Sequence, residues 1–85
     1  MIQCQISLYP LANPDFIEVI NECIKILDNE NISYTVTRTN TLIKGETDAV
    51  FEVTKKIFIK AKELNKENIL LAVYSSACSE WVKKW

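Results

Sequence analysis

The chain has 85 residues, of which 48% are hydrophobic and 25% charged, and its formal net charge is −1. This length allows a single domain over residues 1–85 and leaves no room for a second core. The near-neutral charge argues against a nucleic-acid partner. Because no apolar run reaches the roughly 18–20 residues of a membrane span, and residues 1–3 begin a strand pattern rather than a signal peptide, we expect a cytoplasmic protein with no membrane partner.

Histidine is absent from the sequence, and the three cysteines form no Cys-x-x-Cys pair. This composition excludes the usual zinc ligand sets and every nucleophile that depends on a Ser-His or Cys-His pair. We therefore expect no bound metal, no cofactor and no catalysis.

The first strand is predicted over residues 2–9, where apolar and polar side chains alternate strictly. Its polar face is formed by Gln3, Gln5, Ser7 and Tyr9. Asn13-Pro14-Asp15 then provides an N-cap, a proline at the first helical position and an acid at the positive end of the helix dipole. A helix is therefore predicted over residues 14–29. Its apolar stripe is expected to comprise Phe16, Ile20, Cys23, Ile24 and Leu27.

Two short strands joined by a polar turn are predicted next, over residues 32–38 and 41–45. One face of the first carries the hydroxyl groups of Ser33, Thr35, Thr37 and Thr39, and the second ends at Gly45, the only glycine of the chain. A second helix follows over residues 47–65, with Thr47 as its N-cap and with Phe51 and Phe58 broadening its buried stripe. The continuous apolar run in residues 69–75 predicts a last strand that is covered on both faces.

The resulting order is βαββαβ, which is typical of the ferredoxin-like α+β sandwich, a four-stranded antiparallel sheet with two helices on one face. The other face would be polar but uncharged, with Leu70, Ala72 and Tyr74 contributed by the last strand, or the opposite set if the register shifts by one. Such a face suits a subunit interface or a small-molecule surface. We therefore expect self-association as a dimer or tetramer.

Three segments, SLYPL (Ser7–Leu11), TNTLIKGE (Thr39–Glu46) and SSACSE (Ser75–Glu80), together resemble the YkoF-like family, which binds thiamine and hydroxymethylpyrimidine (HMP). The stretches between them resemble that family's helices. The resemblance implies a ferredoxin-like fold, association through sheets, and a pyrimidine pocket near the hairpin turn and a neighbouring strand. The chain departs from the family at Ser76 and Ser79, which stand where asparagine and proline are expected. Some members carry two copies of the domain in one chain, so a single copy would need a second subunit.

The resemblance implies a non-catalytic binding protein for thiamine or its HMP precursor, acting in capture or delivery of the ligand. The amide of Asn40 carries a donor and an acceptor for the aminopyrimidine, the ring of Tyr9 could stack on it, and the carboxylate of Glu46 could pair with the thiazolium cation of thiamine. The ligand-binding residues expected on this basis are Tyr9, Thr39, Asn40, Thr41, Glu46, Ser75 and Cys78.

An ACT-like regulatory sensor domain for a small molecule is the alternative, because it shares the βαββαβ order. Such domains usually bind at a glycine-bearing turn after the first strand, and residues 9–13 contain no glycine. An acylphosphatase-like enzyme would need a glycine-rich phosphate loop, and an RNA-binding module would need a basic, aromatic third strand. Neither feature is present.

Overall fold

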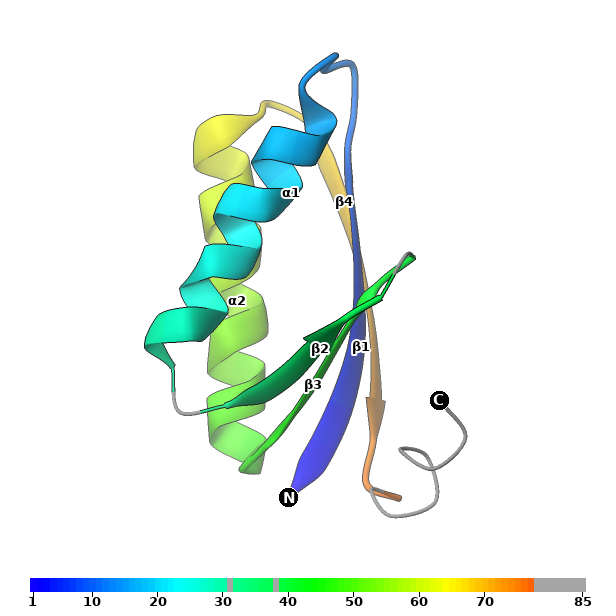
Figure 1. The fold of residues 1–85 in the computed structure, drawn as a ribbon, viewed down its shortest axis with the longest axis vertical. Coiled ribbons are helices and arrows are strands. Elements are labelled where there is room, and N and C mark those ends of the chain that lie inside the picture. Colours follow the sequence, from blue (N-terminus) through cyan, green and yellow to red (C-terminus); the bar gives the residue numbers. More distant parts are fainter. Residues whose placement is uncertain (31, 38, 78–85) are drawn as a thin grey trace.

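The computed structural model describes residues 1–30, 32–37 and 39–77 (Figure 1). The elements of these described residues are, in order, β1 (Ile2–Pro10), α1 (Phe16–Ile24), the short 3-10 helix η1 (Lys25–Asn29), β2 (Ser33–Val36), β3 (Thr41–Gly45), α2 (Thr47–Leu64) and β4 (Asn68–Ser75). The predicted ferredoxin-like α+β fold is confirmed. No helix in the described part of the chain is long and apolar enough to cross a membrane.

The four strands form one antiparallel sheet in the order β2-β3-β1-β4. Both helices cover the same face of this sheet, and no helix of the described residues covers the opposite face (Figure 1). The register places Cys4 of β1 opposite Ile43 of β3 and opposite Tyr74 of β4. Side chains of even-numbered β1 residues therefore point toward the helices, and those of odd-numbered residues lie on the open face.

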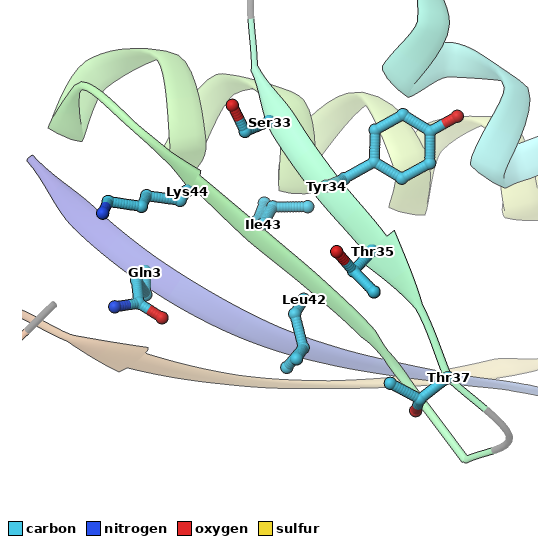
Figure 2. Close-up of a pocket in the computed structure, with 8 residues that line it drawn as sticks. All are labelled: Gln3, Ser33, Tyr34, Thr35, Thr37, Leu42, Ile43 and Lys44. Atoms are coloured by element: carbon cyan, nitrogen blue, oxygen red, sulfur yellow. The ribbon is translucent and has the colours of Figure 1, made fainter. Parts of the chain in front are cut away.

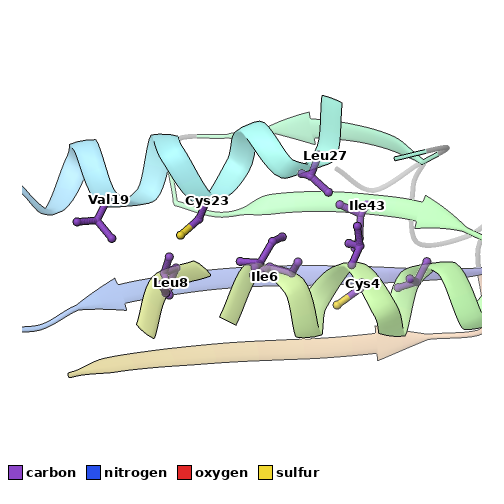
Figure 3. Packing of buried hydrophobic residues seen from close by; sticks show 11 residues of the cluster. Cys4, Ile6, Leu8, Val19, Cys23, Leu27 and Ile43 are labelled. Atoms are coloured by element: carbon purple, nitrogen blue, oxygen red, sulfur yellow. The ribbon is translucent and has the colours of Figure 1, made fainter. Parts of the chain in front are cut away.

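The core lies between the sheet and the two helices and is built largely from β-branched and other compact apolar side chains (Figure 3). Its buried members are Cys4, Ile6, Leu8, Val19, Cys23, Leu27, Ile43, Val50, Val53, Ile57 and Ala61. They recur at strand spacing in β1 and at helical spacing in α1 and α2, as an amphipathic two-layer fold requires.

The first helix differs from the prediction at both ends. The helix expected over 14–29 begins at Phe16, and from Lys25 its last turns tighten into η1. Asp15 rather than Asn13 is the N-cap, because the helix begins at Phe16, and the Oδ1 of Asn13 accepts a hydrogen bond from the backbone N–H of Asp15 at 2.8 Å in a turn before the helix. Likewise, the N-cap of α2 is Glu46 and not Thr47, because Thr47 is already the first residue of the helix.

All three phenylalanines, expected in the apolar stripes of the helices, are largely exposed. Phe16 stands at the first residue of α1. Phe51 stacks on Tyr74 with the ring centroids 4.3 Å apart, and both line a shallow groove together with Phe58. These two residues of α2 therefore lie beside the outer strand β4, because the narrow interior is already filled by smaller residues.

Among the described residues, the last strand is covered by other elements on only one face, which corrects the prediction made from its continuous apolar run. Leu70, Ala72 and Tyr74 lie on the helix side, whereas the odd-numbered residues of β4 share the open face with Gln3, Gln5, Ser7 and Tyr9. Ile69, Leu71 and Val73 are 53%, 55% and 44% exposed. The register opposite to the one first considered is therefore the observed one.

Two loops at one end of the molecule are joined by asparagine side chains. Asn65 Nδ2 donates to the backbone carbonyls of Leu11 and Glu67 at 3.1 and 2.8 Å, and Asn13 Nδ2 donates to Asn65 Oδ1 at 3.0 Å. Asn68 Nδ2 donates to the carbonyls of Ala61 and Asn65. These bonds tie the β1–α1 loop to the α2–β4 loop and satisfy the carbonyl group of Ala61 near the end of α2.

Candidate ligand-binding site

The open face of the sheet carries hydroxyl, amide and apolar side chains in aligned rows. One row runs across all four strands from Ser33 through Lys44 and Gln3 to Ser75, and the next runs from Thr35 through Leu42 and Gln5 to Val73. Directly opposed side chains on neighbouring strands have their Cβ atoms about 4.5–5.5 Å apart. The first row can therefore offer several polar groups to one small ligand.

A cavity of about 320 Å³ lies on this face beside the β2–β3 hairpin (Figure 2). Its volume is at the lower end of the range of about 300–1,000 Å³ that is typical of small-molecule sites. Figure 2 shows Gln3, Leu42 and Lys44 on the side of the sheet away from the helices, whereas the Tyr34 ring points toward the helices. The lining residues are Gln3, Ser33, Tyr34, Thr35, Thr37, Leu42, Ile43 and Lys44.

The cavity combines an apolar floor with a polar rim. Leu42 supplies apolar surface at its centre, between the hydroxyl group of Thr35 on one side and Gln5 on the other. Gln3 is only 4% exposed, so its amide is held in place at the wall of the cavity. A flat heterocycle with polar edges is the kind of ligand that such a surface accommodates.

The turn of the hairpin is held by the hydroxyl group of Thr37. The hydroxyl hydrogen of Thr37 is shared between two acceptors, Asn40 Oδ1 at 2.9 Å and the Asn40 carbonyl oxygen at 3.0 Å, and Thr37 Oγ1 accepts from the N–H groups of Thr39 and Asn40. Among the described residues only Ala12, at φ 53°, has a positive φ, so Asn40 does not use the left-handed conformation that asparagine tolerates. Its side chain serves the turn through this hydrogen bond instead.

A smaller cavity of about 120 Å³ lies under the hairpin turn, on the helix side of β2. Thr39, Asn40 and Thr41 line it together with apolar residues of the helices, including Ile20 and Ile24. Thr37 borders both this cavity and the larger one. The hairpin therefore separates two hollows, of which only the larger approaches the usual size of a ligand site.

The structure brings some of the predicted site residues together and separates others. Thr39, Asn40 and Thr41 meet at the turn, where Ser7 Oγ donates to the carbonyl of Thr39 at 3.5 Å. Tyr9 is opposite Ile69 at the far end of β1. Ser75 is opposite Gln3, and Glu46 follows Gly45, which is opposite Ile2, so both lie near the start of β1 and about 20 Å from Tyr9. Cys78 lies outside the described residues.

Four lining residues were predicted on the polar face but not in the site: Gln3, Ser33, Thr35 and Thr37. Leu42 and Lys44 were predicted in neither. These two residues could have been found from their even-numbered positions in β3, combined with the pairing register between β3 and β1. Both occupy even-numbered positions in β3, and β3 pairs with β1 so that Leu42 is opposite Gln5 and Lys44 opposite Gln3. Only the pairing register reveals this, because the segment 41–45 has no regular alternation of its own.

Burial and hydrogen bonding raise the pKa values of three titratable side chains near the sheet. Burial raises the pKa of the Cys4 thiol to about 11 and also raises that of Cys23, so both remain protonated at neutral pH. Tyr34 donates a hydrogen bond to Asp28, which raises the pKa of Tyr34. Across residues 1–30, 32–37 and 39–77, no group of three acidic, cysteine or histidine side chains could hold a metal ion.

Comparison with known proteins decides the family. The model of the YKOF-related family matches residues 1–80. This chain belongs to that family. It is 29% identical over 72 residues to the Bacillus subtilis (strain 168) protein named "Putative HMP/thiamine-binding protein YkoF", with 85% of the chain aligned. The chain spans only 36% of that relative's length.

Solved structures show the same fold. Protein SP2199 from Streptococcus pneumoniae superposes with a TM-score of 0.87 at 20% identity, over 96% of this chain and 97% of the other. A protein from Thermotoga maritima, described as a "putative thiamine biosynthesis/salvage protein", superposes with a TM-score of 0.84 at 20% identity, over 98% and 96% of the two chains. At these identities the likeness establishes the fold of the YKOF-related chain and not its ligand.

Proposed function

We propose that this YKOF-related protein is a non-catalytic binding protein for thiamine or its HMP precursor, acting in capture or delivery of the ligand. The observation that carries the proposal is the cavity of about 320 Å³ on the open face, with Leu42 as its floor and the hydroxyl groups of Ser33 and Thr35 at its rim. The name of the Bacillus subtilis relative supports the same ligand class. The proposal keeps the cytoplasmic location expected from the sequence.

The chemistry of an aminopyrimidine matches this cavity. Its ring is flat and partly apolar, so it can lie on Leu42, while its ring nitrogens and amino group need donors and acceptors at the edge. Hydroxyl groups act as either donor or acceptor, and Thr35 is directly opposite Leu42. The turn residues Thr39, Asn40 and Thr41 are proposed to close the end of the site through Thr37, which borders the cavity.

The experiment that tests the proposal is a calorimetric titration of the chain with thiamine and with HMP. Saturable binding of either ligand is expected, and Thr35→Val should weaken it by about 2- to 10-fold, because one neutral hydrogen bond is lost. Thr47→Val is the matched control, since Thr47 is an exposed residue at the start of α2 that does not line the cavity. Absence of binding by both ligands, or an equal effect of the two substitutions, would contradict the proposal.

We also propose that the chain self-associates as a dimer or tetramer through the open face of the sheet. Ile69, Leu71 and Val73 present three large apolar side chains to solvent on the outer strand β4. A contiguous apolar patch of this kind marks an interaction surface in monomeric folds. A second copy that covers these side chains would lie beside the proposed ligand cavity on the same face.

One observation favours the alternative of an ACT-like sensor, and another argues against it. Ala12 adopts the left-handed conformation at φ 53° in the loop after β1, so this loop has the backbone shape for which glycine is usually chosen. The cavity beside that loop, however, is lined by Asp15, Glu18 and Glu22. Their carboxylates would repel the carboxylate of an amino-acid effector, so the thiamine-related ligand is the better supported one.

A further inference from the structure

Lys44 is the one charged side chain that the described strand residues place on the open face of the sheet. The other members of this face carry amide, hydroxyl, aromatic or aliphatic groups: Gln3, Gln5, Ser7, Tyr9, Ser33, Thr35, Leu42, Ile69, Leu71, Val73 and Ser75. Lys44 belongs to the lining of the large cavity and is a half-buried residue. A cation in this position confers a preference for ligands of one charge.

The acidic residues of the described chain do not neutralise this cation. The ion pairs found in residues 1–30, 32–37 and 39–77 join Lys25 to Glu22, Lys56 to Glu30 and Lys60 to Glu63, all on the helix layer or its loops. The nearest acid along the chain, Glu46, lies between the end of β3 and the start of α2 and forms no ion pair among the described residues. Lys44 is therefore available to an anionic group of a ligand.

The neighbours of Lys44 make this end of the cavity suitable for an oxyanion. Ser33 is directly opposite Lys44 on β2, and its hydroxyl group can donate to a second oxygen of the same group. Lysine binds phosphate as a compact point charge with three donors, and charge-assisted hydrogen bonds are roughly twice as strong as neutral ones. The apolar floor at Leu42 lies one row further along the sheet.

We propose that the site prefers an aminopyrimidine that carries a phosphate ester over one that carries a thiazolium cation. This inference rests on the proposed function and adds the charge of the ligand to it. The pyrimidine ring lies on Leu42 beside Thr35, and the phosphate ester of the hydroxymethyl arm meets Lys44 and Ser33. Thiamine would bring its positive thiazolium into the same row, where Lys44 repels it, and Glu46 lies outside the lining of this cavity.

The test is a calorimetric titration of the full chain with four probes: HMP, its phosphate monoester, thiamine and inorganic phosphate. The monoester is expected to bind at least tenfold more tightly than HMP, and Lys44→Gln should weaken monoester binding by about 10- to 100-fold while changing HMP binding by less than about twofold. Raising the salt concentration should weaken the monoester and not HMP. Lys62→Gln, an exposed lysine in the last turn of α2, is the matched control.

Lys44→Arg separates charge from shape, since it keeps the cation and should retain most of the preference for the monoester. The inference is overturned if the monoester binds no better than HMP, if Lys44→Gln weakens both ligands equally, or if inorganic phosphate binds as tightly as the monoester. In each of these cases HMP or thiamine binding would still stand. Absence of binding by all three pyrimidine ligands instead overturns the proposed function itself.

Discussion

At the scale of single residues, the hydroxyl group of Thr37 organises the hairpin turn beside the candidate site. It contacts the side chain and backbone of Asn40 and accepts from two backbone N–H groups. A β-turn in a short, exposed hairpin has few other interactions to stabilise it. The turn is therefore expected to depend on this one side chain more than on any other in the hairpin.

Thr37→Val should lower the free energy of unfolding by about 1–2 kcal/mol, because the backbone groups of the turn lose their internal partner. Asn40→Ala should cost less, about 0.5–1 kcal/mol, since only its Oδ1 contact is lost. Urea denaturation monitored by circular dichroism measures both values. Thr39→Val is the control, because only backbone atoms of Thr39 take part in the described hydrogen bonds; a loss as large as that of Thr37→Val would contradict the assignment.

At the scale of the elements, Gly45 lets the end of β3 approach the segment before β2. A Cβ atom built on Gly45 would lie 3.1 Å from Cγ1 of Ile32 and 3.6 Å from Cγ2 of Val50. The first distance is closer than ordinary van der Waals contact. The only glycine of the chain therefore serves close packing and not a left-handed backbone, since its φ is not positive.

Gly45→Ala should destabilise the fold by about 1–2 kcal/mol through overpacking. In an Ile32→Ala background the same substitution should cost much less, because the atom that the new methyl group meets is gone. A double-mutant cycle of urea-denaturation free energies measures this coupling. Equal costs of Gly45→Ala in the two backgrounds would show that the contact with Ile32 is not the cause.

At the scale of the whole molecule, the sheet has one face covered by helices and one face open (Figure 1). The apolar part of the open face belongs to β4, at one edge of the sheet, and the proposed ligand cavity lies on the same face toward the other edge, beside β2 and β3. Two copies meeting through β4 residues would bury apolar surface and leave both cavities beside the interface. Stability and ligand affinity would then both depend on protein concentration.

Leu71→Lys should convert the self-associated protein into a folded monomer, because a charge would be placed at the centre of the proposed interface, opposite Ser7. Light scattering after size-exclusion chromatography at micromolar concentration measures the mass. Ile59→Lys is the matched control, since Ile59 is a comparably exposed apolar residue on α2. A monomeric parent protein, or dissociation by Ile59→Lys instead of Leu71→Lys, would refute the interface.

Much of the fold was predictable because its signals are local. The alternation in residues 2–9 and the helical spacing in residues 47–65 each report a period that the backbone itself imposes. The apolar run in β4 has no alternation, so the face that Leu70 and Leu71 occupy could not be read from it. The turn residues Thr39, Asn40 and Thr41 were correctly expected to lie together, since they are consecutive, but their role in ligand binding is a proposal.

The sequence by itself determined which segments are strands and helices, where the turns fall and that β1 has one polar face, because these properties depend on residues within one segment. Only the tertiary structure decided which side chains meet. The sheet order places β1 between β3 and β4, so Lys44 and Ser75 flank Gln3 although they are distant in the sequence. Long-range register selects these neighbours, and a shift of one residue would turn every one of them to the other face.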